Sequence, residues 1–279
     1  MKKQRIYLTV KYFILLSFAV IVLYPFLWLV SGSLKDMQEL FANSMNLIPR
    51  HIKADNYATA YEMGKIGMYY INSIIVTFSA LAILLVATYL GAYPLTRMKL
   101  PGGKWILIAF VSCMMVPMQV VVIPLYKFEA MLHINNTYLG LILPYAAGAL
   151  PFAIYVMAAF LRTIPFAIEE AGLIDGCSRL QMIWRILLPL SRPGLATVLI
   201  FSFMSLWNEF FLAMIIVQDQ SLGTLNVGLL NFKRSFGGTG MDPNLMFAAL
   251  VMISLPVILV YAIFQRQFIS GLTAGSVKT

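Results

Sequence analysis

Six long apolar stretches constrain this chain more than any other feature of its sequence. A helix needs about 20 mostly apolar residues to cross the roughly 30 Å hydrocarbon core of a bilayer. Stretches of that length occupy residues 12–30, 71–95, 105–126, 138–161, 195–217 and 245–264. The sequence therefore predicts an all-α membrane protein with six transmembrane helices.

The composition excludes an ordinary soluble domain. Apolar residues make up 61% of the 279 residues and charged residues only 11%, whereas soluble domains average roughly 45 to 50% and about 25%. The basic start of the chain, with Lys2, Lys3 and Arg5, resembles that of a signal peptide. Because the first apolar run is longer than the usual 7 to 15 residues and lacks a small-residue cleavage site, we expect a retained membrane anchor.

The net charge of +9 follows from membrane topology. With the N-terminus placed inside, thirteen of the 20 Lys and Arg residues fall on the inner side and seven on the outer side. Lys and Arg accumulate in the cytoplasmic loops of membrane proteins, so both termini are predicted to be cytoplasmic. The excess charge then needs no nucleic-acid partner, and anionic lipid headgroups are a secondary attraction.

The inner connection 162–194 is long and patterned, reading RTIPFAIEEAGLIDGCSRLQMIWRILLPLSRPG. Pro165 suits the first turn of one short helix, and Asp175 with Gly176 supplies a turn. Ser178 followed three residues later by Gln181 is a capping box that predicts a second helix up to Pro189. Such a hairpin either only joins two spans or docks a partner, which would justify the cost of ordering it.

This loop carries a family resemblance. It resembles the cytoplasmic signature of membrane subunits of bacterial ABC importers, written E-A-A, D-G-A and I-x-L-P. The signature residues present here are Glu170, Ala171, Asp175, Gly176, Ile186, Leu188 and Pro189, with Gly172 and Cys177 each standing where Ala is usual. The similarity extends to the basic hairpin 97–104, to 117–126, to 207–210 and to the tail 264–279. In these segments the chain is similar to sugar-importing, maltose-type permeases, and specifically to the second membrane subunit of the heterodimeric pore.

The resemblance implies a non-catalytic permease half in the bacterial plasma membrane. Its partners would be a second, homologous permease subunit, a dimeric cytoplasmic ATPase and an extracytoplasmic substrate-binding protein. The loop would form a coupling helix that seats in the ATPase, with coupling residues Glu169, Glu170, Ala171, Gly172, Asp175 and Gly176. We expect two parts of the chain, 1–70 with the first transmembrane helix and an external segment, and 71–279 with the permease core and the coupling loop 162–194.

The sequence itself holds no motif for cofactor chemistry. No G-x-x-x-x-G-K-[ST] motif occurs, so ATP is expected to be bound by another chain. His51 and His133, with Cys113 and Cys177, are too few and too scattered for a metal or disulfide framework. We therefore expect no cofactor, no metal and no catalytic constellation in this chain.

Gln119, Asn208 and Glu209 are polar residues inside the third and fifth predicted spans. A carboxylate at the bilayer centre costs roughly 2.5 to 3.5 kcal/mol on insertion scales, so Glu209 should face protein or water. These residues could line the translocation path, or they could only join neighbouring helices. An alternative function is a proton-coupled secondary transporter with Glu209 as the relay, although the sequence lacks the internal repeats of such proteins.

Overall fold

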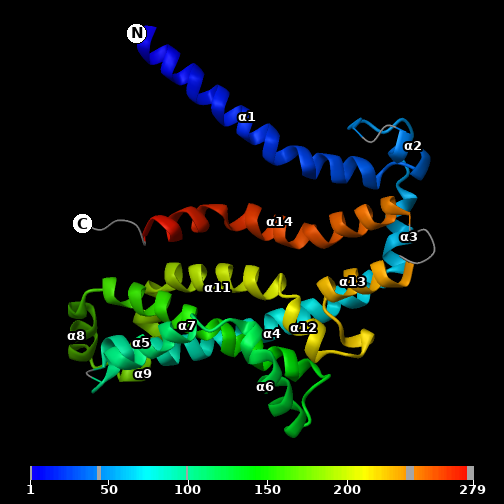
Figure 1. The fold of residues 1–279 in the computed structure, drawn as a ribbon. Helices are drawn as coiled ribbons and strands as arrows, with labels where there is room; N and C mark the ends of the chain where they lie inside the picture. Colours follow the sequence, from blue (N-terminus) through cyan, green and yellow to red (C-terminus); the bar gives the residue numbers. More distant parts are fainter. Residues whose placement is uncertain (1, 43–44, 99, 237–241, 275–279) are drawn as a thin grey trace. The chain divides into compact units, whose positions relative to one another are not determined.

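The described part of the chain is entirely helical. The computed structural model describes residues 2–42, 45–98, 100–236 and 242–274, and within these ranges no strand occurs (Figure 1). The longest helices are α1 (Lys2–Ser33), α4 (Ile66–Arg97), α7 (Tyr138–Thr163) and α14 (Pro243–Ala274). The prediction of an all-α protein is confirmed. Of the basic residues used for the topology prediction, Lys99 and Lys278 lie outside the described residues.

Shorter elements connect these long helices. They are α2 (Met37–Ala42), α3 (Asp55–Met63), α5 (Gly103–Cys113), α6 (Met118–Met131), α8 (Phe166–Ile174), α9 (Arg179–Gln181), α10 (Leu188–Leu190), α11 (Arg192–Trp207), α12 (Phe211–Ile216) and α13 (Leu225–Phe236). A π-helical turn spans Met182–Leu187, and a 3-10 turn spans Gln220–Leu222.

Four helices of the described chain are each long and apolar enough to cross a membrane. They cover Gln4–Ser33, Ile66–Arg97, Tyr138–Thr163 and Pro243–Gln265, and so contain the first, second, fourth and sixth predicted spans. Two further candidates are bent helix pairs, α5 with α6 at 98° and Arg179–Leu190 with α11 at 71°. By length and composition the described residues hold four spans, or up to six if each bent pair is one span.

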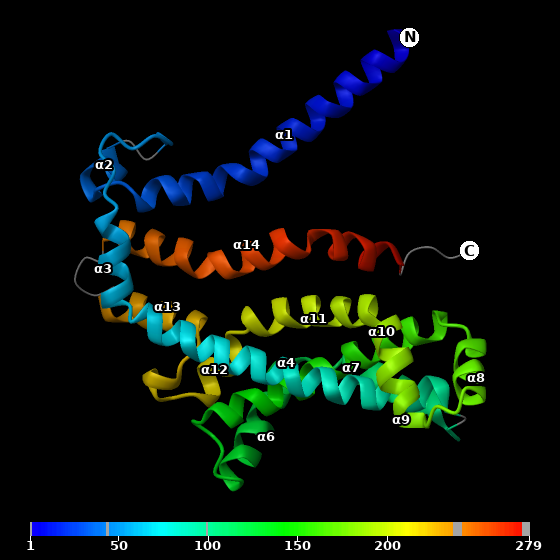
Figure 2. The same cartoon turned by 180° about the vertical axis from the view of Figure 1, so that it is seen from behind.

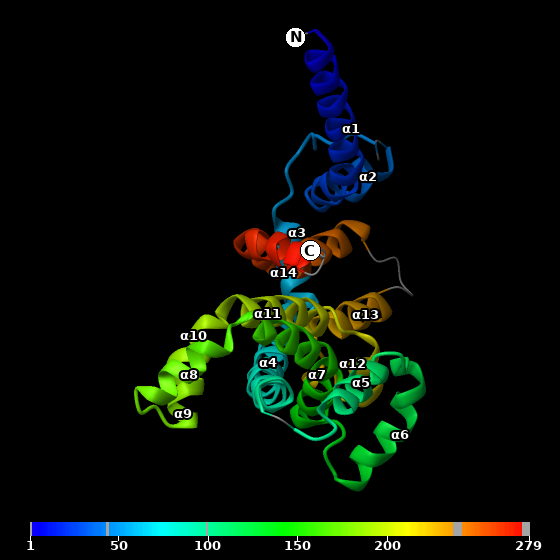
Figure 3. The ribbon, with the colours of Figure 1, turned by 90° about the vertical axis from the view of Figure 1, so that its left-hand side faces the viewer.

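The third predicted span is not one continuous helix. α5 ends at Cys113 and α6 begins at Met118, with Pro117 in an extended conformation between them. Proline lacks an amide donor and disfavours helical geometry in the residue before it, so Val116 and Pro117 break the helix. Figure 3 shows α6 turning away from α5.

The fifth predicted span is interrupted as well. α11 ends at Trp207, with Asn208 as its C-cap, and α12 begins at Phe211. The expectation of an unbroken helix over 195–217 is therefore wrong at residues 208–210. Hydropathy averaged over the whole stretch counts Asn208 and Glu209 as two polar residues within one span and does not show the break.

The chain divides into two compact units. One consists of Met1–Met68 with Gly228–Leu255, and the other of Tyr69–Val227 with Pro256–Thr279. The boundary at 68/69 lies beside the predicted boundary at 70/71, but the first unit also includes a C-terminal segment that the sequence did not suggest. The division into 1–70 and 71–279 remains a prediction.

Buried polar contacts hold the first unit together around Lys35. This residue is fully buried, and its ammonium group donates to the backbone oxygen of Asn46. Its own carbonyl accepts from the side-chain amides of Asn56, at 2.9 Å, and of Asn244. Because buried backbone polar groups need partners, these contacts join the segment after α1 to α3 and to the start of α14.

Close helix contacts position the candidate site in the second unit. α7 packs against α11 and α5 (Figure 1). Gly91 of α4 lies against α7, where an added Cβ would come within 2.8 Å of Ile154 Cδ1. Small residues let membrane helices approach closely in this way. α8, α9 and α10 lie together at one end of this unit, and α12 lies at the other (Figure 2).

Candidate functional site

The loop with the signature residues folds as two short helical segments joined by a tight turn. α8 begins after Pro165, which is its N-cap, and its last residue is Ile174. Gly176 then adopts a left-handed conformation with φ of +82°. The amide of Cys177 donates to Gly172 O at 2.9 Å, and that of Gly176 donates to Leu173 O at 3.1 Å. These two bonds form a Schellman motif, which requires a residue that tolerates positive φ.

The second segment starts at the predicted capping box. The amide of Gln181 donates to Ser178 Oγ at 3.3 Å, and the amide of Ser178 donates to Gln181 Oε1 at 2.9 Å. This part of the prediction is confirmed. The helix expected up to Pro189 is present as one helical run, Arg179–Leu190, whose middle part, Met182–Leu187, is π-helical.

Gly172 brings the two segments close together. It is buried, and a Cβ added to it would come within 2.7 Å of Met182 Cε and 2.9 Å of Ile186 Cδ1. The absence of a side chain therefore lets α8 pack directly on the π-helical turn. This contact explains why glycine suits a position where the family signature usually has alanine, and it gives Gly172 an internal packing role.

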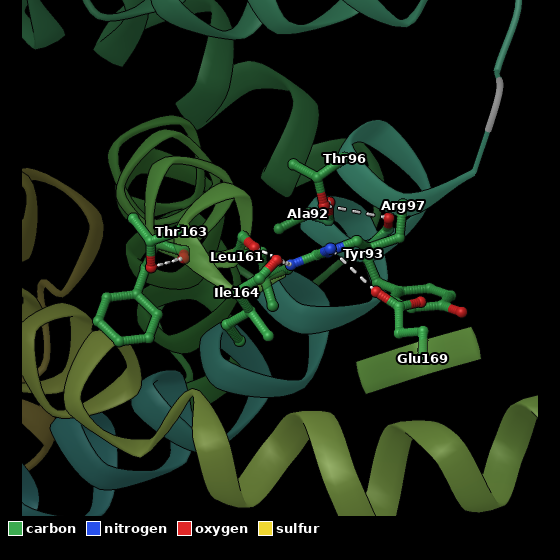
Figure 4. Close-up of polar contacts among 9 residues, drawn as sticks. Ala92, Tyr93, Thr96, Arg97, Leu161, Thr163, Ile164 and Glu169 are labelled. Atoms are coloured by element: carbon green, nitrogen blue, oxygen red, sulfur yellow. Dashed lines mark hydrogen bonds and ion pairs between the residues drawn. The ribbon is translucent and has the colours of Figure 1, made fainter. Parts of the chain in front are cut away.

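Arg97, the last residue of α4, makes polar contacts with both α8 and the end of α7. Its side chain is 0% exposed, and its Nη1 lies 3.0 Å from Glu169 Oε1. Its Nη2 donates to the carbonyl of Ile164, at 2.8 Å, and to that of Leu161 (Figure 4). The guanidinium also lies over the ring of Phe166, 4.6 Å from its centroid. Sequence reasoning treated Arg97 only as part of a basic hairpin and missed this role.

The two adjacent glutamates of α8 lie in different environments. The Glu169 side chain is 13% exposed and paired with Arg97, whereas Glu170 is exposed. Burial raises the pKa of the Glu169 carboxyl above its ordinary value, and the Arg97 guanidinium opposes that rise. Of the other predicted coupling residues, Ala171, Asp175 and Gly176 are exposed. Among the predicted coupling residues, those accessible to a partner are therefore Glu170, Ala171, Asp175 and Gly176.

A hollow of about 490 Å³ lies between the end of α4, α8 and the start of α9. Its charged lining consists of Arg97, Glu169, Glu170 and Arg179. The rest of the lining is Tyr93, Met98, Leu100, Phe166, Leu173 and Met182. Within the described ranges, no group of three or more His, Cys, Asp or Glu side chains is placed to hold a metal ion.

Glu209 occupies the break between α11 and α12. Its Oε1 accepts from the amide of Leu212 at 2.7 Å, and its Oε2 accepts from the amide of Ala213 at 3.1 Å. The hydroxyl of Tyr145 on α7 donates to the same Oε2 at 2.6 Å. The carboxylate thus satisfies amides at the start of α12, which have no partner within that helix, and ties the break to α7.

The other two candidate path residues are exposed. The Asn208 side chain donates to Met204 O at 2.8 Å, one turn back in α11. Gln119 lies in the first turn of α6. No hydrogen bond among the described residues joins Gln119 to Asn208 or Glu209, so the predicted group is distributed over two helix breaks.

Comparison with known proteins assigns the fold and the loop to a family. Residues 83–273 match the family model of binding-protein-dependent transport system inner membrane components. The chain belongs to this family. The matched residues include all of α8, the turn at Gly176 and Glu209, so this permease carries its candidate site inside the family domain. The family assignment and the apolar helices make it a multi-pass inner-membrane protein.

Individual relatives of this permease are similar over nearly their full length. The diacetylchitobiose uptake system permease protein NgcG of Streptomyces coelicolor is 34% identical over 275 residues, covering 99% of this chain and 90% of the relative. The trehalose transport system permease protein SugB of Mycobacterium tuberculosis is 34% identical over 257 residues, covering 92% of each chain.

A solved structure of a bacterial ABC transporter involved in alginate import has the same fold. It superimposes on this permease with a TM-score of 0.84 at 24% identity, covering 95% of this chain and 98% of the other. This likeness shows that the two chains share an overall fold.

Proposed function

We propose that this chain forms half of the translocation path of an ATP-driven importer for sugars or oligosaccharides. Relatives at 34% identity over more than 90% of the chain are named for the uptake of diacetylchitobiose and trehalose. The substrate class of this permease follows from those relatives. ATP is bound and hydrolysed by a separate cytoplasmic subunit, and this chain is not itself an enzyme.

The observation that carries the proposal is the structure of the signature loop. α8 is held by the ion pair between Arg97 and Glu169 and packs against the π-helical turn through Gly172. Glu170, Ala171 and Asp175 of this loop remain exposed. A loop that only connected two spans would not need a buried ion pair, a Schellman turn and a capping box. α8 is a preformed element whose exposed side seats in the ATPase.

The remaining partners follow from the family and from the exposed apolar helices. Phe13, Phe18 and Ile21 of α1 are each more than 60% exposed, and such a surface needs lipid or another membrane helix against it. The second, homologous permease subunit and the bilayer provide that cover. An extracytoplasmic binding protein delivers the sugar, and the description of the family as a binding-protein-dependent transport system supports such a partner.

The contacts of Glu209 favour a structural role over a proton relay. Its carboxylate accepts three hydrogen bonds, from Leu212, Ala213 and Tyr145, and protonation would weaken these charge-assisted contacts. Glu209 keeps the helix broken beside the path. Asn208 and Gln119, with exposed side chains at the two helix breaks, are the residues proposed to face the translocation path.

The orientation of the permease is testable by labelling single cysteines. Both termini and α8 are proposed to be cytoplasmic, so Ile174→Cys in a variant without Cys113 and Cys177 should resist an impermeant thiol reagent in intact cells. The same residue should react after the membranes are dissolved in denaturing detergent. Met131→Cys, at the last residue of α6, where the native side chain is 78% exposed, should react from outside. Labelling of Ile174→Cys in intact cells would reverse the orientation.

Assembly tests the proposed function directly. The permease is expressed with a tag, together with the ATPase and the second permease encoded by neighbouring genes, and purified through the tag. We expect all subunits to co-purify and ATP hydrolysis to rise when sugar-loaded binding protein is added. Purification of this chain without any ATPase from cells that express all components would contradict the proposal.

A further inference from the structure

The side chain of Arg97 contacts three helical elements, namely its own helix α4, the end of α7, and α8. Arg97 ends α4, its Nη2 donates to carbonyls at the end of α7, and its Nη1 pairs with Glu169 of α8. We infer that Arg97 is a positioning residue that transmits displacement of α8 to α4 and α7. The inference rests on the proposed function, because it assumes that the ATPase moves α8.

The chemistry of the guanidinium suits this junction. Leu161 lies in the last turn of α7 and Ile164 is its C-cap, and the carbonyls at a helix C-terminus lack intrahelical partners and attract positive charge. A planar guanidinium presents five donors in a fixed fork, so it can serve these carbonyls and a carboxylate together while stacking on Phe166. A lysine ammonium offers three donors at a single point and cannot stack in this manner.

The surroundings make this contact the principal link between α8 and the membrane helices. The other main packing of α8 is against the π-helical turn, through Gly172. Beside Arg97, the space between α4, α8 and α9 is a hollow of about 490 Å³. Since no packed core fills that space, a push on α8 reaches α4 and α7 mainly through the buried guanidinium.

The contacts of Arg97 predict that its role is lost when the charges at positions 97 and 169 are exchanged. If only the attraction to Glu169 mattered, exchanging the two charges would preserve it. With glutamate at position 97, however, a carboxylate would face the carbonyl oxygens of Leu161 and Ile164, and the end of α7 would lose both donors. The double variant Arg97→Glu with Glu169→Arg should therefore remain defective.

The test compares Arg97→Gln, Arg97→Lys, Glu169→Gln and the exchanged pair with Arg179→Gln. Arg179 lines the same hollow but is exposed, which makes it the matched control. The first readout is sugar taken up per ATP hydrolysed by proteoliposomes that hold the full assembly. Removing one partner of a buried charge pair is costly, so Arg97→Gln should lower this ratio by about tenfold or more. Arg97→Lys should recover part of it, and Arg179→Gln should match the wild type.

A second readout does not depend on transport. Spin labels at Ile174→Cys on α8 and Trp105→Cys on α5, in a chain without its native cysteines, report the distance between α8 and the α5–α7 packing. The distance distribution should be narrow in the wild type and in Arg179→Gln, and broad in Arg97→Gln and in the exchanged pair. This measurement uses the purified permease, so it also applies to a variant that fails to bind the ATPase.

The outcomes separate the inference from the proposed function. A wild-type uptake ratio and a narrow distribution in Arg97→Gln would overturn the inference, as would restoration of both by the exchanged pair. Broad distributions in the Arg97 variants, with no ATP-driven uptake even in the wild type, would support Arg97 as the residue that seats α8 and remove the proposed function.

Discussion

Replacing Gly176 with leucine is expected to reduce the ATPase that co-purifies with the permease by roughly 5- to 30-fold, since a left-handed residue with a side chain costs about 1–2 kcal/mol. Gly176 has φ of +82°, and an added Cβ would meet nothing within 4 Å. The substitution therefore strains only the Schellman turn that sets α9 against α8. The protein should still reach the membrane, and its uptake should fall with the loss of the ATPase.

The matched control is Gly176→Asn, because asparagine adopts positive φ more readily than other non-glycine residues. It should retain most of the co-purified ATPase. Quantification of the ATPase per permease in tagged preparations measures the effect, and the amount of permease in the membrane corrects for expression. Normal co-purification and uptake in Gly176→Leu would show that the turn does not position a docking element.

Replacing Glu209 with leucine is expected to lower the amount of permease in the membrane by about tenfold or more. The substitution leaves the amides of Leu212 and Ala213 and the hydroxyl of Tyr145 without their acceptor. All three residues are buried, and each unsatisfied buried donor costs about 1–3 kcal/mol. Immunoblots of isolated membranes give the abundance.

Glu209→Gln provides the comparison, since the amide keeps the size and one acceptor oxygen while losing the charge. It should remain in the membrane and keep much of its uptake. A leucine variant as abundant and active as the wild type would show that the carboxylate does not hold the helix break. If Glu209→Gln assembles normally but has no uptake, the Glu209 carboxyl acts as a proton relay instead.

The helices could be predicted from sequence where a local pattern of neighbouring residues determines them. Apolar length located the long helices, and the Ser178–Gln181 pair located the start of α9, because both patterns act over a few neighbouring residues. The break at 208–210 was missed because the Glu209 carboxylate stabilises it through hydrogen bonds to Leu212, Ala213 and Tyr145. A hydropathy scale assigns that carboxylate only an unfavourable transfer free energy and does not include these hydrogen bonds. In the third span, Pro117 and Pro124 on either side of Gln119 are a visible sign of a broken helix, although apolar length alone counts residues 105–126 as one span.

The candidate site was predictable in location but not in orientation. The signature identified the α8 loop, yet it did not show that Glu169 faces inward and Glu170 outward. That difference depends on Arg97, which lies in a distant part of the sequence. Its other partners are the backbone carbonyls of Leu161 and Ile164, which every residue type possesses and which therefore leave no pattern in the sequence. Gly172 was likewise grouped with the coupling residues, whereas the structure uses it for packing between the two loop segments.

Uptake by proteoliposomes is the measurement that tests the central claim most directly. The vesicles hold the full assembly with ATP enclosed, binding protein and labelled sugar outside, and an ionophore that collapses the pH gradient. The account predicts uptake that continues without the gradient, requires hydrolysable ATP, and persists in Glu209→Gln. Uptake that survives without ATP but stops when the gradient is collapsed would identify a proton-coupled carrier and contradict the assignment.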